Sequence, residues 1–108
     1  MRRLEGKVAI VTGSGQGIGR GIALVYAREG AHVVVAELKE HRAQRTAEEI
    51  ASEGGSALAL AVDVSHREQV ERMVAVTIER FGRLDVVVNN AQGMHAHKPF
   101  EEITDEDF

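Results

Sequence analysis

The chain has 108 residues and no cysteine, so it forms at most one domain and can have neither a disulfide nor a thiolate nucleophile nor a cysteine-based zinc site. Hydrophobic residues make up 44% and charged residues 28% of the sequence, which is ordinary for a soluble globular protein. A net charge of −4 gives no reason to expect binding to nucleic acid or to an anionic membrane. The first apolar run, Val8 to Val11, is too short for a signal-peptide core or a membrane span, and we expect a cytoplasmic protein.

Four apolar, β-prone runs recur along the chain at nearly even spacing. Counted from Val8, Val33, Leu58 and Asp85, the steps are 25, 25 and 27 residues. Helical patterns fill the gaps, and this alternation is typical of successive βα units with right-handed crossovers. The sequence therefore predicts an α/β fold with a doubly wound parallel sheet in the order β-α-β-α-β-α-β. The predicted strands are Val8–Val11, His32–Ala36, Ala57–Val62 and Leu84–Val88.

The first two helices end at glycines. An amphipathic pattern with Ile18, Ile22 and Val25 follows the first strand, and the helix is expected to close at Gly30. The second helix is predicted over roughly Lys39 to Glu53, before Gly54-Gly55. Its apolar face is thin, so it should lie at the surface, and that face consists mainly of Ala43, Ala47 and Ile50.

The third helix has a predicted capping box at its start, with Ser65 as the N-cap and Glu68 three residues later. Gly82 is expected to end it. Its predicted buried face comprises Val70, Met73, Val74, Thr77, Ile78 and Phe81.

The end of the sequence indicates an unfinished sheet. The run Asp85 to Asn89 is apolar at consecutive positions, which is typical of a strand covered on both faces. No fifth strand follows, so the fourth strand would leave a long apolar edge. Thr104 to Phe108 has the pattern of a helix start, with a threonine N-cap and an acidic first turn. We therefore expect residues 1–108 to be the N-terminal part of a larger domain.

A glycine-rich loop joins the first strand to the first helix. The segment reads Thr12-Gly13-x3-Gly17-x-Gly19, with four glycines in the seven positions from 13 to 19. Strand, glycine loop and helix in this order open a dinucleotide-binding βαβ unit. The glycines let the chain turn with positive φ and let a pyrophosphate approach the N–H groups at the helix start.

Three further polar positions follow predicted strands. Glu37 lies 18 residues past Gly19, near the spacing of about 20 at which an acidic residue binds the adenosine ribose hydroxyls. Such a carboxylate would face a 2′-phosphate as a like charge, so Glu37 favours NAD over NADP; alternatively it is a surface turn residue. Asp63 either bonds the adenine amino group or satisfies local N–H groups at a helix start. Asn89-Asn90 either lies under a ligand or forms an Asn-rich turn.

These motifs together resemble the cofactor-binding half of the short-chain dehydrogenase/reductase family, and the resemblance covers essentially the whole chain. It implies a Rossmann-type fold, NAD as the cofactor and hydride transfer between nicotinamide and an alcohol or carbonyl substrate. Gly13, Gln16 and Ile18 would line the pyrophosphate and ribose, Glu37 the adenosine ribose, and Asp63 and Val64 the adenine. Asn90 and Ala91 would lie along the middle of the cofactor, although Gln92 stands where the family usually has glycine. The full set of predicted cofactor-binding residues is Thr12, Gly13, Ser14, Gln16, Gly17, Ile18, Gly19, Glu37, Asp63, Val64, Asn90 and Ala91.

The family's catalytic residues have no counterpart in this sequence. Members use a tyrosine with a lysine four residues later, together with a serine. Here the one tyrosine is Tyr26, expected to pack within the first helix, and the residue four positions on is Gly30. We assign no catalytic residue. The pair His95 and His97 lacks an obvious third ligand, so no metal site is assigned either.

Three hypotheses remain open at this stage. The first is an N-terminal part of an NAD-dependent dehydrogenase/reductase, inactive alone. The second is a non-catalytic NAD-binding or protein-interaction module, and the third is a broken reading frame without function. NAD(H) is the expected partner, a small alcohol or carbonyl substrate is expected only for a longer form, and a homo-oligomer is left open.

Overall fold

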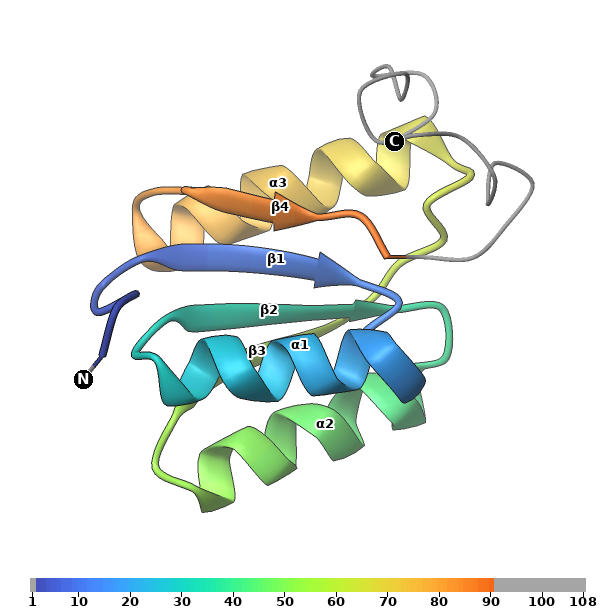
Figure 1. Cartoon of the computed structure of the whole chain (residues 1–108). Helices are drawn as coiled ribbons and strands as arrows, with labels where there is room; N and C mark the ends of the chain where they lie inside the picture. The colour runs from blue at the N-terminus through green and yellow to red at the C-terminus, as the bar shows by residue number, and fades with distance from the viewer. Residues whose placement is uncertain (1, 91–108) are drawn as a thin grey trace.

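The computed structural model describes residues 2–90, which form four parallel strands and three helices in strict alternation (Figure 1). The strand order is β3-β2-β1-β4, and every neighbouring pair is parallel. The predicted doubly wound sheet is therefore confirmed. The elements are β1 (Val8–Thr12), α1 (Gly17–Arg28), β2 (His32–Glu37), α2 (Glu40–Ser52), β3 (Ser56–Ala61), α3 (Arg67–Phe81) and β4 (Val86–Val88).

Helices cover both faces of the sheet. Figure 1 shows α1 and α2 together on one side and α3 on the other. Along β2, Val33 and Val35 pack with the first pair of helices, whereas Val34 packs with Met73 of α3. Successive side chains of a strand point to opposite faces, so a strand buried on both sides needs apolar residues at consecutive positions. This arrangement explains why the apolar runs of β1 and β2 are uninterrupted.

The register brings the carboxyl ends of all four strands to one edge of the sheet. Thr12, the last residue of β1, pairs with Ala36 of β2, and Val11 pairs with Val88 of β4. Glu37 at the end of β2 pairs with Ala61 of β3. The loops that leave these strands are therefore neighbours, although they are distant in sequence.

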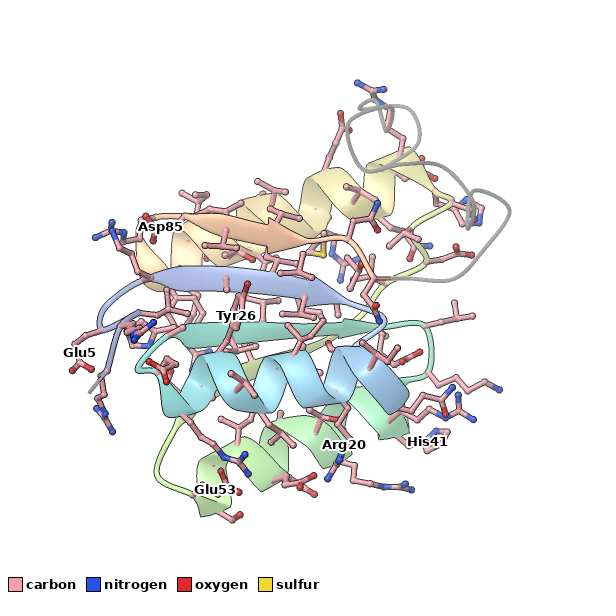
Figure 2. All side chains as sticks on the ribbon, viewed as in Figure 1. Glu5, Arg20, Tyr26, His41, Glu53 and Asp85 are labelled. Atoms are coloured by element: carbon pink, nitrogen blue, oxygen red, sulfur yellow. The ribbon has the colours of Figure 1, made fainter. Side chains whose placement is uncertain are left out.

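The opposite end of the sheet, where β1 and β4 begin, is fixed by Asp85, which Figure 2 shows beside the start of β1. Its carboxylate accepts the Val8 N–H at 2.8 Å and binds the Arg83 guanidinium through both oxygens at 2.7 and 2.8 Å. The hydrogen bond from Arg83 and then that from Val8 hold the pKa of Asp85 below its ordinary value. A charged Asp85 therefore stabilises the junction between β1 and β4.

The capping prediction for α3 is wrong. The helix begins at Arg67 with His66 as its N-cap, and the cap has no side-chain hydrogen bond. Ser65 instead donates its hydroxyl to Asp63 Oδ1 at 2.6 Å. Serine side chains can bond to nearby groups outside a helix, and here the local carboxylate is the partner. The helix does end before Gly82, as predicted.

The apolar pattern of the first helix marks its buried side only at Ile22, which packs against the core. Ile18 is 77% exposed and Val25 is 51% exposed. On α3, the prediction that Ile78 is buried is also wrong, because this residue is 44% exposed. The residues of α1 that face the sheet are Gly19, Ala23, Leu24 and Ala27. They are mostly small because the helix lies close to the strands, so the largest apolar residues are not the deepest ones.

The other helix boundaries differ from the predictions by a residue or two. The second helix runs from Glu40 to Ser52, and its buried residues include Thr46 in addition to Ala43 and Ile50. Two ion pairs join α1 to α2 and its C-cap residue, namely Arg20 with Glu49 and Arg28 with Glu53. Among the described residues, no helix is both long and apolar enough to cross a membrane.

Candidate cofactor-binding site

A cavity of about 360 Å³ opens at the carboxyl edge of the sheet. This is where open α/β sheets bind ligands, and the volume lies within the usual range for small-molecule sites. All four strands contribute to it through the loops that follow them. Its lining comprises Gly13, Gln16, Gly17, Ile18, Glu37, Leu38, Val62, Asp63, Val64 and Asn90.

Most of the predicted cofactor-binding residues meet at this cavity. Eight of the twelve line it. Thr12, Ser14 and Gly19 are buried beside it and support the loop. Ala91 lies outside the described residues, as do Gln92, the histidines at 95 and 97, and the segment 104–108. Sequence reasoning missed Leu38 and Val62, of which Leu38 is 62% exposed. The sequence did offer a signal for Leu38, because it is a large apolar residue directly after a predicted strand and its acidic end residue, Glu37.

The glycine loop leaves the start of α1 open. Gly13 and Gly17 take φ values of 63° and 60°, a left-handed conformation that side chains disfavour. The N-cap residue Gln16 makes no side-chain cap, and the first turn contains no acidic residue. The N–H groups of that turn and the positive end of the helix dipole therefore face the cavity without a competing side chain.

Gly19 lets α1 approach the loop. A Cβ at this position would overlap the carbonyl oxygen of Gly13 and would lie 2.6 Å from Asn90 Nδ2. Only a residue without a side chain fits this approach. The glycine therefore brings the helix, the loop and the end of β4 together around the cavity.

Thr12 ties the ends of β1 and β4 together. Its hydroxyl accepts the Asn90 N–H at 2.9 Å. The same hydroxyl lies 3.3 Å from the Val88 carbonyl and 3.2 Å from Asn89 Oδ1, so its proton is shared between two acceptors. Thr12 is fully buried. The hydroxyl thus sets the position at which Asn90 enters the cavity.

Glu37 is a buried carboxylate at the wall of the cavity. The residue is 8% exposed. Oε1 accepts the Gly15 N–H at 3.0 Å, and Oε2 lies 3.4 Å from the Lys39 N–H. Two backbone N–H groups therefore hold its charge at the end of β2. Among the described lining residues, Glu37 and Asp63 are acidic and none is lysine or arginine.

Asp63 already has local partners. Oδ1 accepts both the N–H and the hydroxyl of Ser65, at 3.0 and 2.6 Å, and Oδ2 lies 3.3 Å from His66 Nε2. The Ser65 hydroxyl and then the Ser65 N–H lower the pKa of Asp63. These contacts match the alternative in which Asp63 satisfies local N–H groups before a helix. The residue also lines the cavity.

The remaining candidates lie away from the cavity. Tyr26 packs against the core beneath α1 and is not among the cavity residues (Figure 2). His32 is at the start of β2, and His41 and His66 are exposed on or beside helices. No group of three or more metal-ligating side chains occurs in the part of the chain that the structure describes.

The fold and the cavity define a nucleotide-binding α/β protein of the Rossmann type. The family model for short chain dehydrogenases matches residues 7–108. The chain belongs to the short-chain dehydrogenase/reductase family.

Individual relatives agree with this assignment. The chain is 46% identical over 108 residues to a hydroxynaphthalene reductase-like protein Arp2 of Metarhizium robertsii, covering 99% of this chain and 40% of the relative. It is 55% identical over 89 residues to the short chain dehydrogenase/reductase astE of Aspergillus oryzae, covering 82% and 34%. The chain therefore spans about two fifths or less of the length of these relatives.

Solved structures show the same fold. A 7α-hydroxysteroid dehydrogenase complexed with NADH and 7-oxo glycochenodeoxycholic acid superposes with a TM-score of 0.83 at 39% identity, covering 92% of this chain and 38% of that one. A hydroxysteroid dehydrogenase from Escherichia coli also gives a TM-score of 0.83 at 39% identity, covering 92% and 42%.

Proposed function

We propose that residues 1–108 form the NAD-binding part of a short-chain dehydrogenase/reductase that transfers a hydride between nicotinamide and a small alcohol or carbonyl compound. The observation that carries this proposal is the cavity at the carboxyl edge of the sheet, which combines an uncapped helix start with a buried carboxylate. Family membership supports it. The sequence contains no Tyr-x-x-x-Lys, so the acid/base chemistry needs residues beyond these 108.

The described residues fit a dinucleotide. The N–H groups of the first turn of α1 would hold the pyrophosphate, because the N-cap leaves them without a side-chain partner. Gly13 and Gly17 leave the backbone bare where the phosphates would approach. Leu38 and Val64 offer apolar surface on the side of Glu37, where the adenosine would lie. When bound, NAD supplies the carbon that accepts or donates the hydride.

The preference for NAD over NADP rests on Glu37. Its second oxygen, Oε2, has only a long contact to the Lys39 N–H and would accept a ribose hydroxyl. A 2′-phosphate at that place would meet a buried carboxylate. Repulsion per unit charge at about 4 Å ranges from roughly 1 kcal/mol in water to about 4 kcal/mol at intermediate dielectric. That range corresponds to about fivefold to several hundredfold in affinity.

Titration of the chain with NADH and with NADPH tests the proposal. We expect NADH to bind at least about fivefold more tightly, and Glu37→Arg to reduce or reverse this ratio. Glu40→Arg makes the same charge change nearby at an exposed position outside the cavity lining, and it should leave the ratio nearly unchanged. Absence of NADH binding by a folded chain would refute the proposed function. An unchanged ratio in Glu37→Arg would refute the role of Glu37.

The alternative is a non-catalytic NAD-binding or protein-interaction module. It is favoured by β4, an apolar three-residue strand that pairs only with β1 among the described strands. The intact mass of the native protein separates the two. A mass clearly above 11.7 kDa would indicate the dehydrogenase, whereas a stable 11.7 kDa species that binds NADH without turnover would indicate the module. The cytoplasmic location stays a prediction.

A further inference from the structure

Gly15 belongs to the loop between β1 and α1. In the folded chain it lies against Glu37 at the end of β2 and against Arg42 of α2. It is not among the residues that line the cavity. A Cβ built on Gly15 would lie 2.6 Å from Glu37 Cγ, 2.6 Å from Glu37 Oε1 and 2.6 Å from Arg42 Cβ. Cβ atoms essentially never approach other atoms this closely, so any side chain at position 15 would displace these neighbours.

Both neighbours would have to give way, and Glu37 gives way more easily than Arg42. The Cβ of Arg42 is attached directly to the backbone of α2, and the Arg42 N–H is bonded to the Lys39 carbonyl at 3.0 Å. The Glu37 carboxylate, in contrast, stands at the end of a side chain with rotatable bonds. Rotating those bonds costs less than shifting a helix that packs against the sheet.

Gly15 also holds this carboxylate directly. Its N–H donates to Oε1 at 3.0 Å, the shorter of the two hydrogen bonds that the Glu37 carboxylate accepts. The absence of a side chain makes room for the glutamate, and the N–H fixes one of its oxygens. The other oxygen is thereby directed away from residue 15. Hydrogen bonds to an ionised group are stronger than those between neutral groups, so this contact is well suited to positioning a charge.

We propose that Gly15 is a positioning residue that sets the choice between NAD and NADP by holding the Glu37 carboxylate at the cavity wall. The inference rests on the proposed function, because it concerns the same cofactor site. It adds a residue outside the cavity lining that acts through Glu37. Residues 15 and 37 act as a pair, because glycine at 15 both makes room for glutamate at 37 and binds it.

The test is a double-mutant cycle on the 108-residue chain with Gly15→Ala, Glu37→Asp and the two combined. The affinities for NADH and NADPH are measured for each variant by calorimetric titration. In Gly15→Ala we expect the ratio of NADPH to NADH dissociation constants to fall about tenfold, the effect of losing roughly one charged hydrogen bond. Glu37→Asp alone should also lower it, because the shorter acid no longer reaches the Gly15 N–H.

In the combined variant the two losses should not add. Because Glu37→Asp already removes the contact with residue 15, adding Gly15→Ala should lower the ratio by less than about threefold further. Gly21→Ala is the matched control, because a Cβ there meets nothing within 4 Å. It should leave the ratio unchanged.

Three outcomes would overturn the inference. One is an unchanged ratio in a folded Gly15→Ala variant. Another is a combined variant in which the two losses add in full. If Gly15→Ala fails to fold, Glu37→Asp alone decides, since an unchanged ratio in that variant contradicts positioning of the carboxylate by the Gly15 N–H. Failure of the unchanged chain to bind NADH would instead refute the proposed function, which keeps the two failures distinct.

Discussion

Three fully buried threonines allow one substitution to be compared in three hydrogen-bonding environments. Thr12, Thr46 and Thr77 are each 0% exposed. The Thr12 hydroxyl joins two strands through the Asn90 N–H. The Thr77 hydroxyl donates to the Met73 carbonyl at 2.8 Å, one turn earlier in α3. The Thr46 hydroxyl has no hydrogen-bond partner among the described residues.

Threonine to valine keeps the side-chain shape and removes only the hydroxyl, so the three changes in unfolding free energy should differ in size and sign. Thr12→Val leaves the Asn90 N–H without its partner, and we expect a loss of about 1–3 kcal/mol. Thr77→Val removes a bond to a carbonyl that already takes part in a helix, with a loss of about 0.5–1.5 kcal/mol at most. Thr46→Val removes a buried hydroxyl without a partner and should stabilise the chain by about 1–2 kcal/mol.

Urea unfolding followed by far-ultraviolet circular dichroism measures all three variants, because the chain contains no tryptophan. A change of 1 kcal/mol corresponds to roughly 4–8 °C in the midpoint of thermal unfolding for a domain of this size. The expected order of stability is Thr46→Val, then the original chain, then Thr77→Val and Thr12→Val. Equal changes at all three positions would refute the reasoning, as would Thr46→Val being the most destabilising, because hydrogen bonding would then not determine the effect.

Two further predictions concern pH and the glycine at the start of α1. Because Arg83 lowers the pKa of Asp85 in the folded chain, Asp85 stabilises the fold above its unfolded pKa of about 3.9 and loses that contribution as the pH falls through the lower folded value. Urea unfolding between about pH 2 and about pH 7 should therefore show that the stability of Asp85→Asn falls less with acid than that of the original chain. An identical fall in the two chains would contradict this. Gly19→Ala should weaken NADH binding and destabilise the chain, since its Cβ would overlap the Gly13 carbonyl. Gly21→Ala, in open space on the same helix, should stabilise by about 0.5–1 kcal/mol, and similar losses in both variants would count against the steric argument.

The sequence alone determined the order and type of the elements. Apolar runs at a regular spacing, glycines after helices and the loop from Thr12 to Gly19 are local signals, and each was matched by a strand, a helix end or a turn. These features could be predicted because they depend on residues close together in the chain and on the parallel pairing that βα units impose.

Which side of a helix is buried was decided by packing. Of the three residues in the sequence pattern of α1, only Ile22 packs against the core, and Ala23 and Ala27 face the sheet. Large apolar residues are an unreliable guide where a helix must come close to a sheet, because the space available favours small ones. The folded structure also decided the role of Ser65. Its hydroxyl donates to the Asp63 carboxylate and does not cap the helix, as the sequence had predicted it would.

The inner structure of the site was decided by tertiary contacts. The sequence placed Glu37 after β2 and Gly15 in the loop after β1, but not the hydrogen bond between them. That bond exists because β1 and β2 pair in a register that brings their carboxyl ends together. Residue spacing along the chain carries no information on such a contact across strands. The sequence by itself therefore determined which groups stand at the edge of the sheet, and only the folded chain decided which of them bond to one another.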